Sequence, residues 1–180
     1  MASLVLKMSI SLDGYVASRD GGGAWKTAGS TADSRDRIVE TVSGAGALLL
    51  GATAFTEMAP FWPSASGPFA GPMNAIPKVV FSHSLTSTEW GPTTIATGDL
   101  ADTVTRLEEE YADGYLLALG GARFARSLVE TGLIDEYRLV VHPVVLGAGE
   151  RLFPAPLTLD PVRTTAFSGG VVAHVFSARP

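Results

Sequence analysis

A strand, a glycine pair and a helix follow one another directly between Tyr115 and Glu136, and this stretch most restricts the fold. Residues 116–119 form a continuous apolar run, which is typical of a strand buried on both faces. After Gly120 and Gly121, apolar residues recur at helical spacing as far as Gly132, where a helix is expected to end. The stretch therefore predicts a strand and a helix joined by two glycines.

The glycine pair lies where the carboxyl end of a strand meets the amino end of a helix. Free backbone N–H groups and the helix dipole favour an anion there, and glycines let a phosphate approach the main chain. The pair thus predicts a site for a cofactor that carries a diphosphate. The alternative is that two glycines merely make a tight strand-to-helix turn.

The rest of the chain alternates strands and helices before it changes to hairpins. Strands are expected at 4–10, 47–51, 78–81 and 93–97, and helices at 30–42, 52–58 and 99–111. Residues 60–77 read as a long surface loop, and Gly147-Ala148-Gly149 as a turn. The runs at 137–142, 163–167 and 171–177 are typical of antiparallel strands.

This order of elements predicts an α/β fold of three layers in a single domain over residues 1–180. We expect a mostly parallel central sheet with helices on both faces and an antiparallel C-terminal hairpin edge. Ligands of such sheets bind at the carboxyl ends of the strands. Gly51, Ser82 and the Gly120-Gly121 pair all lie at such ends, which favours the cofactor over a plain turn.

Composition narrows the class of protein. The 180 residues are 46% hydrophobic with a mean hydropathy of +0.25, which suffices for a large core, and no apolar run approaches the roughly 20 residues of a membrane span. A net charge of −5 disfavours nucleic acid as a partner. The absence of cysteine excludes disulfides and thiol nucleophiles, and we expect a cytoplasmic protein without a metal.

Four stretches carry a resemblance to a known family: SLDGYVA, LLLG before a short helix, KVVFSHSL, and LGGARFARSLVETGLIDEYRLVVHPVVLGAGERLF. Together they resemble the dihydrofolate reductase-like superfamily, and more narrowly the stand-alone relatives of the pyrimidine reductase domain of riboflavin biosynthesis. The resemblance implies an NADPH-dependent reductase, usually a homodimer, with a small-molecule substrate in a cleft beside the nicotinamide.

The resemblance also implies which residues hold the cofactor. They are Gly120, Gly121, Ala122 and Arg123 around the diphosphate through main-chain N–H groups, Phe124 behind that turn, Gly51, Ala52 and Thr53 at a second phosphate-side turn, Ser82 and His83 by the adenosine end, and the backbone of Val16 and Ala17 at the nicotinamide carboxamide. A lone histidine such as His83 is otherwise more often polar surface.

Three positions depart from the family pattern. The family commonly has Arg where Ala52 stands, Thr where Ala54 stands, and a basic residue where His83 stands. A 2′-phosphate is bound best by a guanidinium or ammonium group. NADPH is therefore the expected cofactor, with NADH as an alternative.

Reduction by a nicotinamide also needs a proton, and a carboxylic acid is one source. Asp13 and Asp33 are the candidates, with Asp36 in reserve, and either would need burial to raise its pKa toward neutrality. The alternatives are that Asp13 only forms a turn and that Asp33 only interacts with a helix dipole.

Trp25, Phe55, Met58 and Trp62 are candidates for an apolar pocket that accepts a flat heterocycle, although each would also suit a core. We therefore expect an NAD(P)H-dependent reductase of a small heterocyclic, pyrimidine- or pterin-like, or carbonyl or imine substrate. The alternative is a non-catalytic nucleotide-binding protein that retains the reductase fold. The zinc-deaminase signature of the riboflavin pathway is absent from the sequence.

Overall fold

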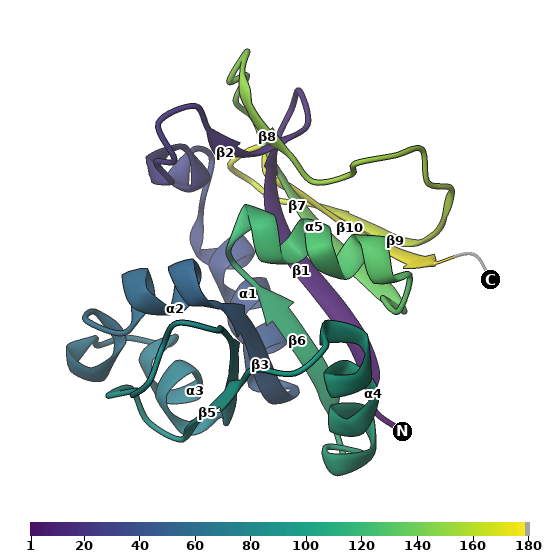
Figure 1. Cartoon of the computed structure of the whole chain (residues 1–180). Helices are drawn as coiled ribbons and strands as arrows, with labels where there is room; N and C mark the ends of the chain where they lie inside the picture. The colour runs from purple at the N-terminus through teal and green to yellow at the C-terminus, as the bar shows by residue number, and fades with distance from the viewer. Residues whose placement is uncertain (179–180) are drawn as a thin grey trace.

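The computed structural model describes residues 1–178 and builds them around one eight-stranded sheet (Figure 1). Its strands are β1 (Ser3–Ser11), β3 (Ala45–Gly51), β4 (Lys78–Phe81), β5 (Thr93–Ala96), β6 (Tyr115–Leu119), β7 (Glu136–His142), β9 (Leu159–Ala166) and β10 (Val172–Ala178). They lie in the order β5-β4-β3-β6-β1-β7-β10-β9. The first six are mutually parallel, whereas β10 is antiparallel to both β7 and β9, which confirms the expected antiparallel C-terminal edge.

Helices cover both faces of this sheet, as expected. They are α1 (Ala32–Ser43), α2 (Ala52–Met58), α3 (Ala70–Ala75), α4 (Leu100–Glu110) and α5 (Ala122–Thr131), with short 3-10 turns η1 (Ala24–Thr27) and η2 (Trp62–Ser64). Helices α4 and α5 pack on one face, and α1, α2 and α3 contribute to the core on the other. The architecture is the three-layer, dihydrofolate reductase-like arrangement that the sequence predicts.

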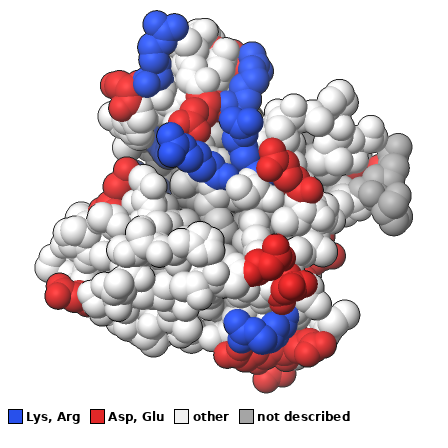
Figure 2. Space-filling model, viewed as in Figure 1, with Lys and Arg blue, Asp and Glu red and all other residues white. Residues whose placement is uncertain are grey.

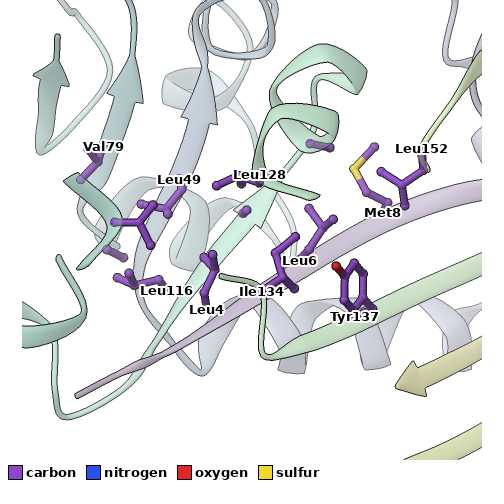
Figure 3. Packing of buried hydrophobic residues seen from close by; sticks show 14 of the residues in the cluster. Leu4, Leu6, Met8, Leu49, Val79, Leu116, Leu128, Ile134, Tyr137 and Leu152 are labelled. Carbon is purple, nitrogen blue, oxygen red and sulfur yellow. The ribbon is translucent and has the colours of Figure 1, made fainter. Parts of the chain in front are cut away.

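Alternation along the central strands produces two cores. In β3, Leu49 faces the core beneath α4 and α5, and its neighbours Leu48 and Leu50 face the core on the α1, α2 and α3 side. Figure 3 shows the first core, in which Leu128 of α5 packs toward Leu49 and its neighbours. A strand buried on both faces needs apolar residues at every position, which explains the uninterrupted runs in β3 and β6.

Two expectations about loops are wrong. The segment 60–77 contains η2 and α3, with Met73 of α3 buried in the second core. Gly149 is not part of a turn but begins β8 (Gly149–Arg151), which pairs with β2 (Tyr15–Ser18) as a separate two-stranded sheet. β8 reads Gly-Glu-Arg and β2 buries only Val16, so neither has the apolar run that identified β4.

Lys78 is a lysine in the core, at the start of β4. Its residue is 1% exposed, and its ammonium donates to the carbonyl oxygens of Ile76 at 2.8 Å and Asn74 at 3.3 Å. It also lies 4.8 Å from the ring centroid of Trp90. Burial lowers the pKa of Lys78 to about 8, and this direction determines how the stability of the protein changes with pH.

Lys78 is expected to make the protein more stable as pH rises from about 8 to 10.5, because the unfolded state binds more protons in that window. The gain in unfolding free energy is about 3 kcal/mol at most. In Lys78→Met this rise is absent, so the difference between wild type and variant in urea unfolding grows in favour of the wild type with pH. Parallel pH profiles for the two proteins would contradict this.

Candidate functional site

A cleft of about 470 Å³ opens at the carboxyl ends of the parallel strands. Its walls come from β2, η1 and β8 on one side and from α2 and α5 on the other. Nine of the twelve residues expected to hold the cofactor line it: Val16, Ala17, Gly51, Ala52, Thr53, Gly121, Ala122, Arg123 and Phe124. The topology thus brings together segments that lie more than 100 residues apart.

Glycines shape the floor of the cleft. Gly120 and Gly121 have φ values of +73° and +71°, which side chains rarely adopt. A Cβ on Gly51 would lie 2.7 Å from Cβ of Phe124, so only glycine lets the starts of α2 and α5 approach this closely. Gly121, the residue before α5, offers no side chain to cap the free N–H groups of the first turn. This arrangement fits a diphosphate, because the N–H groups and dipole of α5 are available to an anion.

Three expected cofactor residues do not line the cleft. Gly120 packs on α2, since a Cβ there would meet Met58 Cε at 3.0 Å. Ser82 is buried, and its Oγ accepts the backbone N–H of Leu85 at 3.0 Å. His83 is exposed beyond the end of β4. The residue of β4 that does line the cleft is Phe81, whose ring lies 5.1 Å from that of Phe124.

The Asp13 carboxylate joins two turns rather than facing the cleft. It accepts Ser11 Oγ at 2.7 Å and the backbone N–H groups of Leu146 at 3.1 Å and Gly147 at 2.7 Å. These bonds, that of Ser11 first, lower the pKa of Asp13 to about 2. A proton donor needs the opposite shift, so the structure supports the turn-forming alternative.

Asp13→Asn is expected to lower Tm at neutral pH. Both carboxylate oxygens of Asp13 accept hydrogen bonds, and the NH2 group that replaces one of them in asparagine can only donate. The native carboxylate has a depressed pKa, so its stabilising effect is present above about pH 4 and is lost as pH falls toward 2. The variant should not show that acid-dependent loss, which unfolding curves between pH 2 and 5 would measure. Its Tm should also remain below that of Asp36→Asn, a matched change on the exposed side of α1. Equal Tm values for the two variants at pH 7 would argue against this role.

Asp33 likewise has a structural role. Its carboxylate accepts the backbone N–H of Ser34 at 2.9 Å and that of Ser168 at 3.1 Å, and it accepts the hydroxyl of Thr31. These bonds, that of Thr31 first, lower its pKa. Asp33 therefore ties the start of α1 to the β9–β10 turn and lies outside the cleft lining, so the burial required of a proton donor is missing here too.

None of the four candidate pocket residues lines the cleft. Phe55 is 4% exposed and stacks on Trp90 in the second core, and Trp62 packs between Phe61 and Phe69. Met58 lies behind the Gly120 turn. These three side chains follow the core alternative, and the apolar cleft wall comes from Met8, Phe81 and Phe124 instead.

Trp25 is outside the cleft lining, although the next residue, Lys26, is part of it. The Trp25 ring packs edge-on against His142, with ring centroids 5.7 Å apart. His142 Nδ1 lies 3.1 Å from the carbonyl oxygen of Ala28, so it carries the proton, and Nε2 keeps its lone pair. Within residues 1–178, Nε2 of His142 and Nε1 of Trp25 are buried without a hydrogen-bond partner. Burial lowers the pKa of His142, the bond to Ala28 opposes this, and Lys7 and Lys26 lower it further.

Three charged residues of the cleft were not expected from the sequence. Lys26 of η1, Glu57 of α2 and Glu150 of β8 all line it. The surrounding protein lowers the pKa of Lys26, and the Glu57 carboxylate across the cleft raises it. Figure 2 shows basic side chains with acidic ones among them above the hollow of this face. Single charges outside any motif give no sequence signal, which is why they were missed.

The described residues contain no cluster of three or more His, Asp and Glu able to hold a metal ion. Nor does any helix within residues 1–178 have the length and apolar character needed to cross a membrane.

The sheet order, the glycine turns and the position of the cleft together define an α/β domain of the dihydrofolate reductase-like fold class. The chain belongs to the RibD C-terminal domain family, whose model matches residues 2–173. This family is the reductase domain of riboflavin-biosynthesis enzymes. A curated relative, the uncharacterized protein YyaP of Bacillus subtilis strain 168, is 28% identical over 182 residues, which cover 96% of this chain and 93% of that protein.

Solved structures share the fold. A putative riboflavin biosynthesis protein from Shewanella sp. PV-4 has a TM-score of 0.79 at 20% identity, with both chains fully covered. A pyrimidine reductase-like protein from Corynebacterium diphtheriae has a TM-score of 0.74 at 11% identity, covering 99% of this chain and 92% of its own. A deaminase/5-amino-6-(5-phosphoribosylamino)uracil reductase from Thermotoga maritima has a TM-score of 0.70 at 18% identity, and 99% of this chain matches 57% of that one.

Proposed function

We propose that the protein is an NAD(P)H-dependent reductase that transfers a hydride to a small heterocyclic, pyrimidine- or pterin-like, or carbonyl or imine substrate. The observation that carries the proposal is the convergence of the Gly121 turn, the start of α5 and the Gly51-Ala52 turn on one cleft. The cleft volume of about 470 Å³ lies within the usual range of 300–1,000 Å³ for small-molecule sites. Membership of a family of reductase domains supports the same chemistry.

In this proposal, each wall of the cleft binds a different part of the cofactor or supplies the proton. The N–H groups at Gly121, Ala122 and Arg123 hold the diphosphate, and the backbone of Val16 and Ala17 orients the nicotinamide. The bound dinucleotide supplies the hydride. We assign the accompanying proton to the ammonium of Lys26, since it lines the cleft and has a lowered pKa.

Thermal unfolding with NADPH, with NADH and without nucleotide tests cofactor binding. A ligand that binds only the native state stabilises it by about 2.7 kcal/mol at a hundredfold excess over Kd, which raises Tm by several degrees. We expect this shift with at least one dinucleotide, followed by cofactor oxidation at 340 nm with part of a panel of heterocycles and carbonyl compounds. No shift with either nucleotide would overturn the proposal.

A second candidate is a non-catalytic nucleotide-binding protein. The observation in its favour is that Asp13 and Asp33, the expected acids, have lowered pKa values and structural partners. Cofactor binding without oxidation by any acceptor would support this candidate, and any turnover would exclude it. We also propose that the protein is cytoplasmic and that it forms a homodimer, the latter because the resemblance implies it, and light scattering of the purified chain tests the oligomeric state.

A further inference from the structure

The turn of the β9–β10 hairpin lies directly against the segment that joins η1 to α1, although the two are far apart in the chain. A Cβ on Gly169 would overlap the carbonyl oxygen of Gly29, and a Cβ on Gly29 would lie 2.5 Å from the carbonyl oxygen of Gly169. Each backbone therefore occupies the space that a side chain on the other would need. Only glycine at both positions permits this close approach.

Further contacts hold the same two segments together. The Asp33 carboxylate accepts the backbone N–H of Ser168 at 3.1 Å and its hydroxyl at 3.3 Å. Pro143, the residue after β7, fills the space on another side of Gly29, since a Cβ there would lie 2.8 Å from the proline Cγ. The hairpin turn and Pro143 thus limit where the chain between η1 and α1 can lie.

This contact leads through η1 to the cleft. His142 Nδ1 donates to the carbonyl oxygen of Ala28 at 3.1 Å, and the Trp25 ring packs against the same imidazole. The Lys26 ammonium lies 5.7 Å from the centroid of the Trp25 ring, and Lys26 lines the cleft. The charged and titratable groups that interact with this ammonium come from β1, α2 and β7, and they are Lys7, Glu57 and His142.

The chain before η1 supplies no comparable restraint. Residues 20–24 are exposed and include three consecutive glycines. Within the part of the chain that the structure describes, their hydrogen bonds remain among residues 18–27. The position of η1 therefore depends on what holds its other end, which is the hairpin turn together with His142.

We infer that the turn of the β9–β10 hairpin positions η1, and with it the Lys26 ammonium, at the cleft through the backbone contact between Gly29 and Gly169. This inference rests on the proposed function, which assigns the proton of the reaction to Lys26. Gly29, Gly169 and Asp33 are positioning residues in it, because they act through η1 and do not line the cleft themselves.

Gly169→Ala tests the inference, because the added Cβ would push against the carbonyl oxygen of Gly29. The surrounding protein lowers the pKa of Lys26, so displacing η1 should raise that pKa toward the ordinary value of a lysine. Competitive labelling of amines over a pH series, read by mass spectrometry, measures this shift without any turnover, with the exposed amino terminus as the internal reference. With an accepted substrate, kcat should fall about a hundredfold from misplacement of the proton donor, and the Kd for NADPH should stay unchanged.

Gly170→Ala is the matched control. It lies in the same turn at a φ of +87°, so alanine strains the turn, but its Cβ would lie 3.7 Å from the nearest atom, Cγ of Pro143. The pKa of Lys26 should not change in this variant. Asp33→Asn gives a second test that adds no atom to the contact. It weakens the bonds to Ser168 and should raise the pKa of Lys26 less than Gly169→Ala does, whereas Asp36→Asn on the same helix should not raise it.

The outcomes separate this inference from the proposed function. An unchanged pKa of Lys26 in folded Gly169→Ala would overturn the inference and leave the reductase proposal standing, and so would an equal rise in Gly170→Ala. If Gly169→Ala does not fold, equal pKa values of Lys26 in Asp33→Asn and Asp36→Asn would overturn it. If wild type oxidises neither dinucleotide with any acceptor, the reductase proposal fails, and the labelling still decides whether the hairpin turn positions Lys26.

Discussion

Gly121→Ala is expected to lower the affinity for both NADPH and NADH about a hundredfold, which corresponds to the loss of about 3 kcal/mol. The added Cβ would lie 3.4 Å from Cβ of Ala54 and 3.8 Å from Cβ of Phe124, between the two turns that line the cleft. It would thus occupy the space through which a phosphate reaches the main chain. Two charge-assisted N–H bonds lost at about 1.5–3 kcal/mol each account for the effect.

Gly132→Ala provides the matched control for this change. Gly132 has a φ of +70°, close to the +71° of Gly121, but its Cβ would meet no atom within 4 Å. Both variants pay a conformational cost for a side chain at positive φ: about 1–2 kcal/mol of unfolding free energy for Gly132→Ala, which lies in the left-handed helical region, and more for Gly121→Ala, whose ψ of 99° lies outside that region. Only Gly121→Ala should lose the nucleotide-induced rise in Tm. A retained rise in Gly121→Ala would place the diphosphate elsewhere.

Gly149→Ala is expected to destabilise the protein by about 3 kcal/mol, the upper end of the range for overpacking. Gly149 begins β8 and pairs with Ser18 of β2, and its φ is +152°. A Cβ there would overlap the carbonyl oxygen of Ala17, a backbone atom that no rotamer change can move. The two strands would have to separate, which displaces one wall of the cleft. Cofactor binding should therefore weaken together with stability.

Gly147→Ala is the control for that variant. Gly147 lies two residues earlier in the same connection, has a φ of +71°, and would place its Cβ in open space. Urea unfolding should show a loss of about 1–2 kcal/mol for Gly147→Ala from positive φ alone. If the two variants lose the same amount, the β2–β8 pairing is not what requires glycine at position 149.

Local sequence patterns identified the elements with strong periodicity. The continuous apolar runs of β3 and β6 demanded a strand covered on both sides, and the structure confirms a mostly parallel sheet between helical layers. The limits of α2 and β4 were also predicted to the residue. β8 and α3 were missed because they lack the apolar run that identified β4: β8 reads Gly-Glu-Arg, and α3 contains Gly71 and Pro72.

The candidate site likewise has features that the local sequence predicted and features that it did not. Glycines at strand ends were visible in the sequence, since a turn between a strand and a helix has few solutions, and most of them line the cleft. The carboxylates of Asp13 and Asp33 were proposed as proton donors from their residue type alone. Asp13 and Asp33 each accept a bond from a nearby hydroxyl, that of Ser11 or Thr31, and further bonds from N–H groups at positions 146, 147 and 168, so contacts across more than 130 residues add to the local lowering of their pKa.

The sequence by itself thus determined the layers of the fold and the backbone turns, because periodicity and glycine act through neighbouring residues. Tertiary structure alone decided which charges meet. Folding brings Lys26 opposite Glu57, turns Asp13 into a link between two loops, and places Arg123 in the lining of the cleft. Coulomb energy and desolvation depend on distance and burial in space, and neither quantity is encoded in a local stretch of chain.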